Sequence, residues 1–266
     1  MRNSNSLLAL NDITSAVKRH HLVGVLGWQD VRQRYRRSAL GPFWITIGMA
    51  VMIATIGIVF GQIFKTPLYD FFPFLAIGTI LWSFMSTVIA EGSMGFISAE
   101  AIVKQLPIPL FVHILRMIWR NLLILGHNIV IFPLVLLAVG KPLTWLALLS
   151  IPALALTILN LAWISLILGI LCARYRDLPN IVNSVLQVVF YLTPIMWMPK
   201  LLPARAGVFL LDANPFYHMI EIVRAPLLGE LPSTLNWGVS IGLAIVGWTC
   251  AIVFFGRYRN RIAYWL

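Results

Sequence analysis

The sequence predicts an all-α integral membrane protein with six transmembrane helices. Of its 266 residues, 60% are hydrophobic and 11% are charged, whereas about a quarter of the residues in soluble domains are charged. Uncharged apolar windows recur along the chain, each as long as the roughly 20 residues that a helix needs to cross a bilayer. None of them alternates with the period of two that typifies a membrane β-strand. This composition excludes disorder, and two cysteines exclude a disulfide scaffold.

The expected spans follow from the six windows that contain no Asp, Glu, Lys or Arg. They cover residues 43–64, 71–90, 121–140, 142–173, 178–199 and 231–256. The third span is expected to begin earlier, with Arg116 and Arg120 in its first turns. One membrane domain, 1–266, is therefore predicted, with an N-terminal arm (1–42), five spans within 43–199, a segment at 200–230, the sixth span (231–256) and a tail (257–266).

The net charge of +11 indicates topology rather than nucleic-acid binding. If the N-terminus lies inside, fifteen Lys and Arg residues fall on the inner side and five on the outer side. Inner loops of membrane proteins collect basic residues, so both termini are expected in the cytoplasm.

The N-terminal arm is expected to form an amphipathic helix in the membrane interface. Its apolar side is a stripe of residues three or four apart: His21, Val25, Trp28, Val31 and Tyr35. The arm ends in four arginines: Arg32, Arg34, Arg36 and Arg37. These either anchor the chain by the positive-inside rule or bind the phosphate of a lipid, which guanidinium forks suit well.

Two short inner segments are either simple connectors or docking surfaces for a cytoplasmic partner. In the first, Ser98 is expected to cap a short helix that carries Glu100 in its first turn and ends before two prolines. In the second, at 174–179, Asp177 is expected to cap the next helix, with Pro179 near its first turn.

The segment 200–230 is apolar, yet four charged residues prevent a clean span. Breaks are expected at Pro203, at Asn214 with Pro215, and at Pro226, which leaves two pieces of about ten residues. Pieces of that length do not cross the hydrocarbon core. They form either a re-entrant helix pair, buried by protein, or a flat surface helix.

Motifs of catalysis are absent from the sequence. No phosphate-binding loop or H-E-x-x-H pattern occurs, and Cys172 and Cys250 stand alone. His127 and Asn128 lie within the third span, where an interhelical hydrogen bond is favoured over a functional role. The many aromatic residues either form interfacial belts or line a sugar conduit. No catalytic residue, metal ligand or cofactor is predicted.

Two motifs carry a family resemblance. They are RYRRSALGPFW, from Arg34 to Trp44, and NPFYHMIEIVRAPLLG, from Asn214 to Gly229, before the last span. With the six spans, they resemble the membrane subunit of polysaccharide-exporting type-2 ABC transporters over nearly the whole chain. The first motif is most similar to the O-antigen branch.

The resemblance implies a transport subunit of the bacterial inner membrane rather than an enzyme. It implies a homodimer with two ATP-binding-cassette subunits, which hold the ATP and Mg²⁺, and a polysaccharide on undecaprenyl pyrophosphate as substrate. A capsular polysaccharide or teichoic acid exporter of the same family is an alternative, and an intramembrane enzyme that processes prenyl lipids is a rival of another class.

The resemblance also implies four sets of site residues. The pyrophosphate would meet Arg32, Arg34, Arg36 and Arg37. Candidate glycan contacts in the channel are Trp44, Phe60, Tyr191 and Trp197. Coupling to the ATPase would use Ser98, Glu100, Ile102, Lys104, Arg174, Tyr175, Arg176 and Asp177. A periplasmic gate at 200–230 would include Asn214, Pro215, Phe216, Tyr217, Glu221 and Arg224.

Overall fold

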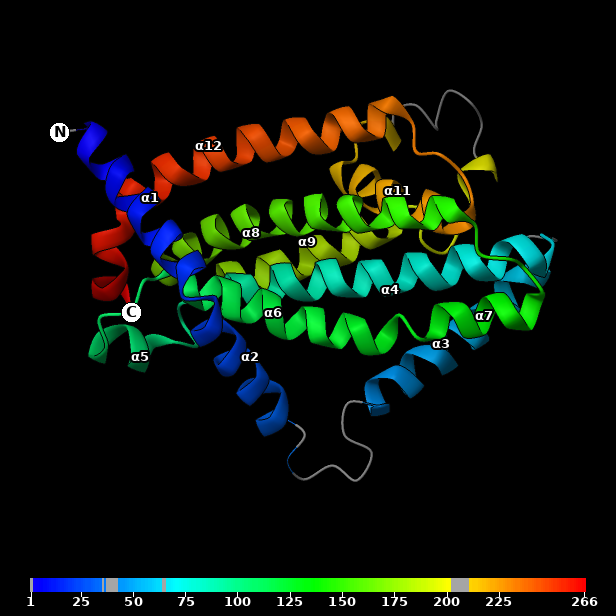
Figure 1. Ribbon diagram of the computed structural model, residues 1–266, viewed down its shortest axis with the longest axis horizontal. Coiled ribbons are helices and arrows are strands. Elements are labelled where there is room, and N and C mark those ends of the chain that lie inside the picture. The colour runs from blue at the N-terminus through cyan, green and yellow to red at the C-terminus, as the bar shows by residue number, and fades with distance from the viewer. Residues whose placement is uncertain (1, 35, 37–42, 64–65, 202–210) are drawn as a thin grey trace.

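The computed structural model describes residues 2–34, 36, 43–63, 66–201 and 211–266, and every regular element among them is helical (Figure 1). The helices are α1 (Arg2–Lys18), α2 (His20–Arg34), α3 (Phe43–Ile63), α4 (Leu68–Ser93), α5 (Glu100–Gln105), α6 (Phe111–Asn128), α7 (Ile131–Val139), η1 (Trp145–Leu149), α8 (Ser150–Arg174), α9 (Leu178–Leu192), η2 (Pro199–Leu201), α11 (Pro215–Leu228) and α12 (Thr234–Trp265). Both termini and α5 lie at one end of the bundle, the terminal end, and α11 lies toward the other.

Five helical segments in the described residues are long and apolar enough to cross a membrane: α3, α4, α6 with α7, η1 with α8, and α12. The fifth expected span, 178–199, is helical only as far as Leu192. Fifteen helical residues span about 22 Å, less than the hydrocarbon core of about 30 Å. Pro194 explains this end, because a proline disfavours helix at the residue before it.

The third span begins at Phe111, as expected, and is interrupted at Ile129 and Val130, between α6 and α7. Pro133 causes the interruption. Its ring lacks an N–H and clashes with the carbonyl four residues earlier, which belongs to Ile129.

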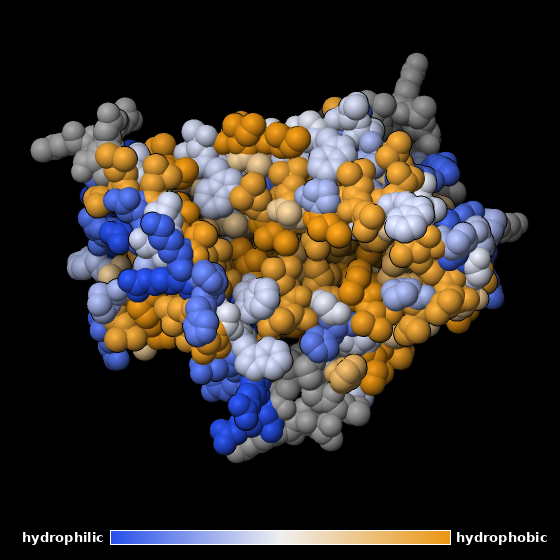
Figure 2. All heavy atoms as spheres, in the orientation of Figure 1, coloured by the Kyte–Doolittle hydropathy of each residue, from blue (hydrophilic) through white to orange (hydrophobic). Residues whose placement is uncertain are grey.

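Helix α4 forms the centre of the bundle, and α3 lies at its edge. In the most apolar window of α4, 78% of the residues are buried, against 11% in α3. Helix α4 contacts α3, α6, α7, α8, α9 and α11. In Figure 2, apolar residues cover the middle of the visible face, and hydrophilic residues gather over α2 and the terminal end.

The N-terminal arm differs from its prediction. It contains a helix that the sequence pattern missed, α1, which packs along α12. Helix α2 packs on α6 and buries Val23, Gly27 and Val31, whereas Val25 and Trp28 are exposed. Val25 and Trp28 thus remain on the outside of the bundle, and the placement of their stripe in the membrane interface stays a prediction. Gly27 lets α2 approach α6 closely. Tyr35 lies outside the described residues.

The predicted caps of two short elements are wrong in detail. Helix α5 forms where expected, but Ala99 precedes it, and the Ser98 hydroxyl bonds the Gly95 carbonyl instead. Asp177 does precede α9, yet its side chain makes no capping hydrogen bond. Pro179 lies in the first turn of α9, as expected.

In the segment 200–230, the predicted break at Asn214 and Pro215 is confirmed. Asn214 caps α11 by accepting hydrogen bonds from the amides of Phe216 and Tyr217. The break predicted at Pro226 is wrong, because α11 continues through it to Leu228. The break at Pro203 and most of the first piece lie outside the described residues.

Candidate functional site

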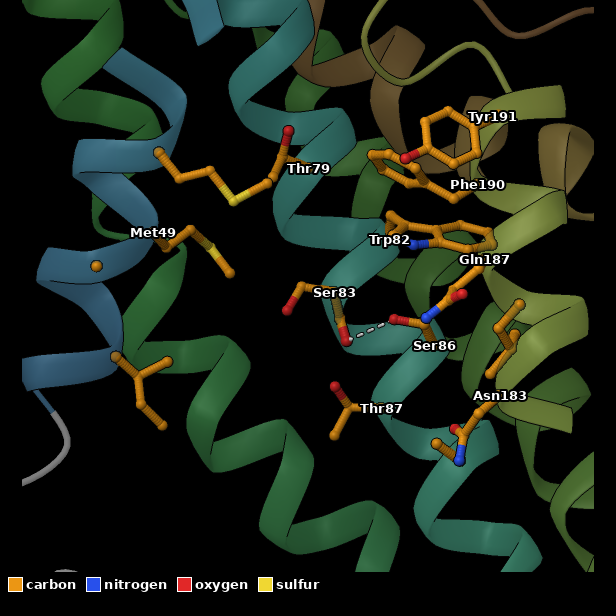
Figure 3. A pocket seen from close by; sticks show the side chains of 15 residues that line it. Met49, Thr79, Trp82, Ser83, Ser86, Thr87, Asn183, Gln187, Phe190 and Tyr191 are labelled. Carbon is orange, nitrogen blue, oxygen red and sulfur yellow. Dashed lines mark hydrogen bonds between the residues drawn. The ribbon is translucent and has the colours of Figure 1, made fainter. Parts of the chain in front are cut away.

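A groove of about 900 Å³ lies between α3, α4 and α9 (Figure 3). Helix α4 contributes one face at helical spacing, and α3 and α9 contribute the two walls. The lining residues are Ile45, Gly48, Met49, Met52, Thr79, Trp82, Ser83, Ser86, Thr87, Ala90, Asn183, Leu186, Gln187, Phe190 and Tyr191. None of them carries a charge, so the groove is suited to a neutral ligand.

Hydroxyl and amide groups form the polar part of this groove. Thr79, Ser83, Ser86 and Thr87 follow one face of α4, opposite two amides from α9, Asn183 and Gln187. Ser86 donates to the carbonyl of Ser83 at 3.3 Å. Within the described part of the chain, neither amide has a hydrogen-bond partner. Polar groups without protein partners at membrane depth indicate a water-filled or ligand-binding space.

Aromatic rings form the end of the groove nearest α11. The Trp82 ring lies 5.8 Å from the rings of both Phe190 and Phe216, and Phe190 lies 5.2 Å from Tyr191. Trp82 is buried, whereas 72% of the Tyr191 side chain is exposed. The Tyr191 ring is therefore exposed to the groove, and it packs against the Phe190 ring, which in turn contacts Trp82.

One of the four predicted glycan contacts, Tyr191, lines the groove. Trp44 is exposed on α3, and Phe60 is half-buried there. Trp197 follows α9 and donates to the Tyr191 carbonyl at 3.3 Å. The α4 hydroxyl row was missed, although its spacing in an uncharged window is a readable signal.

A cluster of charged residues joins α2, α4 and α6 at the terminal end. Arg116 of α6 forms a two-pronged ion pair with Asp30 of α2, its Nε lying 2.7 Å from the carboxylate. Arg120 bridges Asp30 at 3.3 Å and Glu91 of α4 at 2.6 Å. The sequence carries no local signal for the pair of Arg116 with Asp30, because the two residues are 86 positions apart.

The predicted arginine run is described at three positions. Arg34 lies 3.5 Å from Glu91, and 51% of its side chain is exposed. Arg32 and Arg36 are exposed. Arg37 lies outside the described residues. Exposed guanidinium groups are thus gathered where α2 ends.

The two predicted coupling segments meet. Arg176 lies 3.9 Å from Glu100, which also accepts a 2.7 Å hydrogen bond from Lys104. That hydrogen bond, more than the nearby positive charges, lowers the pKa of Glu100. Arg174 packs against the ring of Tyr175, and Ile102 is half-buried. Ser98 and Asp177 are exposed. A polar surface of two short segments is therefore present at the terminal end.

The predicted gate residues attach α11 to its neighbours. Arg224 is fully buried; it bonds Glu221 at 2.5 and 3.0 Å and the Pro194 carbonyl at 2.7 Å, and its guanidinium lies 4.0 Å from the centre of the Phe74 ring. Asn214 donates to Thr193 at 2.9 Å. Helix α11, which begins at Pro215 with Phe216 and Tyr217 in its first turn, is thereby held against α4 and the chain after α9.

The polar pair of the third span forms the predicted interhelical hydrogen bond. Asn128 accepts from Thr46 of α3 at 3.1 Å, and His127 bonds the Leu123 carbonyl of its own helix. Among the described residues, no group of three His, Cys, Asp or Glu side chains is placed to hold a metal ion.

Comparisons with known proteins agree with this architecture. The family model of the ABC-2 type transporter matches residues 21–228. Two O-antigen export system permease proteins RfbA from Klebsiella pneumoniae are 24% and 23% identical over 251 and 248 residues, in each case 91% of this chain and 93% of the relative. One from Myxococcus xanthus is 21% identical over 201 residues, 74% of this chain and 76% of the relative.

These matches and the five apolar helices of the described residues define the type of protein. It is a transport subunit rather than an enzyme, and a multi-pass protein of the bacterial inner membrane. The chain belongs to the membrane-protein family of ABC-2 type transporters.

Proposed function

We propose that this chain is the channel-forming subunit of an ABC exporter for a lipid-linked polysaccharide, with O-antigen on undecaprenyl pyrophosphate as its substrate. The observation that carries the proposal is the uncharged groove of hydroxyl, amide and aromatic side chains between α3, α4 and α9. The names of the relatives that share over 90% of their length with this chain support the choice of substrate.

The chemistry of the groove fits a glycan better than an ion or a lipid tail. Sugar hydroxyls need donors and acceptors, which Ser83, Asn183 and Gln187 offer inside an apolar bundle. The C–H faces of sugar rings pack on aromatic rings, which Tyr191 offers. A divalent ion would call for carboxylate ligands, and an acyl chain gains nothing from amides.

A second copy of the chain would complete the channel. Beside the groove, α3 and α9 expose apolar side chains such as Val51, Val185 and Val188. Apolar faces of this kind contact either lipid or protein in a membrane. The proposed homodimer places the two grooves side by side and encloses a polymer between them.

ATP hydrolysis in two partner subunits would drive transport. The terminal end, with its basic residues, is proposed to face the cytoplasm, so that α5 and the segment at 174–177 contact the ATPases. Closure of the ATPases would press on these segments, and rigid helices would carry the motion to the groove and to α11, the proposed periplasmic gate. The arginines at the end of α2 would hold the pyrophosphate.

The test is export by reconstituted vesicles and in cells. Vesicles holding this chain and its ATPase subunits should move lipid-linked glycan only with ATP, and a deletion strain should accumulate that glycan inside. Export by this chain alone would refute the proposal, as would normal surface glycan in the deletion strain. The sugars that accumulate separate O-antigen from a capsular polysaccharide or teichoic acid.

A variant of α9 connects the test to the groove. Gln187→Leu should reduce ATP-driven export at unchanged protein level, because it removes a groove amide. The control is Val246→Leu, an exposed position on α12 outside the groove lining and outside the proposed dimer face.

A further inference from the structure

A second cavity, of about 290 Å³, lies between α3, α4 and α6. It is lined by Arg34, Ile45, Ile80, Ser83, Phe84, Thr87, Asn121, Ile124, Leu125 and Asn128. Ile45, Ser83 and Thr87 also line the groove, so the cavity is a side branch of it. Its volume is near the lower limit of the roughly 300–1,000 Å³ of ligand pockets, which suits one small group rather than a polymer.

Two buried amides give this cavity its chemistry. Asn121 and Asn128 are 3% and 4% exposed, and both line it. The amide nitrogen of Asn121 donates to Glu91 and to the Met117 carbonyl, and the Asn128 oxygen accepts from Thr46. Among the described residues, the Asn121 oxygen and the Asn128 nitrogen have no hydrogen-bond partner.

These free ends are an acceptor and a donor inside a membrane helix bundle. Both atoms open onto the cavity, where water or a polar ligand can supply the missing hydrogen bonds. The two residues are seven positions apart on α6, which separates them by about 10 Å along its axis. The two free groups are therefore farther apart than a single water molecule can bridge. Ile80, Phe84 and Leu125 form an apolar wall of the same cavity.

A cation lies on the same cavity. Arg34 lines it, with 51% of its side chain exposed and a 3.5 Å ion pair to Glu91. Glu91 has closer partners in Arg120 and Asn121, both at 2.6 Å. Arg34 can therefore leave Glu91 for a phosphate without stranding the carboxylate.

Resting on the proposed function, we propose that this cavity binds the sugar phosphate at the lipid end of the substrate. Arg34 meets the phosphate, and Asn121 and Asn128 hydrogen-bond the first sugar, whose ring packs on the apolar wall. From there the glycan enters the groove past Ser83 and Thr87, which line both spaces. The cavity thus selects the first sugar, while the groove accommodates the rest of the polymer.

The test compares three probes on the purified exporter complex in detergent: a polyprenyl pyrophosphate carrying one hexose, the same lipid without sugar, and the free hexose phosphate. Wild-type protein should bind the sugar-bearing lipid about tenfold more tightly than the sugarless lipid, as two additional hydrogen bonds predict. Equal affinity for both lipids overturns the proposal. Equal affinity for the free sugar phosphate overturns the commitment to a lipid-linked ligand.

Asn128→Leu should reduce the preference from about tenfold to about threefold, because one of the two hydrogen bonds remains, and should leave the affinity for the sugarless lipid unchanged. The matched control is Thr46→Val, which removes the same Thr46–Asn128 hydrogen bond but keeps the cavity amide. If Thr46→Val loses the preference equally, the effect is structural and the proposal fails. Ile124→Phe is a second variant, which fills the cavity without removing a hydrogen bond and should abolish the preference, because the sugar is then excluded.

ATP-driven export in vesicles tests the proposed function separately. If the wild-type complex exports glycan but shows no preference for the sugar-bearing lipid, only the cavity assignment is refuted. If it shows the preference but no ATP-driven export, the exporter function is refuted instead.

Discussion

The two ends of the helix bundle hold their elements together with charged residues in opposite ways. At the terminal end, three acids each serve several donors: Asp12, Asp30 and Glu91. At the other end, one arginine, Arg224, serves a carboxylate, a carbonyl and a ring. Arg224 is fully buried, whereas the side chains of Arg116 and Arg120 remain 23% and 22% exposed.

The two ends differ in how many alternative partners each charged group has. Loss of one partner in the terminal cluster leaves the others paired, and water reaches the groups that remain. Loss of Arg224 leaves the Pro194 carbonyl and the Glu221 carboxylate with no other donor among the described residues, because this one fully buried side chain serves both. The terminal end is thereby suited to rearrangement, and the α11 end to a single locked arrangement.

The largest expected effect comes from removing the arginine of the α11 end. Arg224→Met should lower the free energy of unfolding by about 3 kcal/mol or more, because it breaks a buried ion pair. Urea unfolding in detergent measures the loss. Arg32→Met, at an exposed position, is the control. The double variant Arg224→Met with Glu221→Met should lose less than the single one, since no carboxylate is left unpaired; an equal or greater loss would contradict this account.

Asp12 should have the next largest effect. It accepts hydrogen bonds from the amides of Leu110 and Phe111 at 3.2 and 3.0 Å and from Arg259 at 2.8 Å, so a residue of α1 caps α6 and fixes α12. Asp12→Ala should cost about 2 kcal/mol. Asp12→Asn should cost about half as much, because its amide oxygen still caps α6. Protease cleavage of α1, with exposed Thr14→Ala as control, shows whether the helix has detached.

The terminal cluster should respond less to a single change. Asp30→Asn removes one acid, but Arg120 retains Glu91, so a loss of about 1 kcal/mol is expected from this partly exposed site. Asp30→Asn combined with Glu91→Gln should cost more than the two single losses added, because the last carboxylate partner of Arg120 is then gone. Additive losses would show that the pairs act independently.

The sequence predicted the helices of this molecule well and the contacts between them poorly. Uncharged windows located α3, α4 and α12, because a bilayer sets both length and composition. The caps at Asp12 and the ion pairs of Asp30 join residues 86 to 99 positions apart, and no local pattern encodes them. Helix α1 was missed for the same reason: its buried face is Ala9, Asp12 and Ala16, while its leucines are exposed.

For the candidate site too, the sequence predicted some residues and missed others. Tyr191 was predicted because the family resemblance implied a channel lined by the fifth span, and Asn214 because Asn before Pro marks a helix start. The α4 hydroxyls and the two cavity amides of α6 were not assigned a shared role. Serine, threonine and asparagine occur in membrane helices for many reasons. Only the packing of α3 and α9 against α4 shows that they share a space.

The smallest effect on stability, and the clearest on the proposed function, is expected at α5. Glu100 is held by exposed Lys104 and Arg176, and exposed pairs contribute little. Its pKa is lowered from 4.5, so the contribution of its charge is present above pH 4.5 and lost as the pH falls through the lower value in the folded chain. Between pH 6 and 8 that small contribution is constant, so Glu100→Arg should lower the unfolding midpoint only slightly. The difference from wild type should not change with pH in this range, and a change would contradict the assignment.

Asp177→Arg provides the comparison, because it alters the adjoining segment without breaking a capping bond or an ion pair of the described structure. If both segments contact an ATPase, both charge reversals should reduce ATP-driven export in vesicles while insertion stays normal and the unfolding midpoint changes little. A loss only in Glu100→Arg would attribute the effect to the pair with Arg176 and Lys104 rather than to a docking surface. Unchanged export in both variants would show that these two segments do not couple the chain to an ATPase. The charged residues at this end would then serve only to join helices.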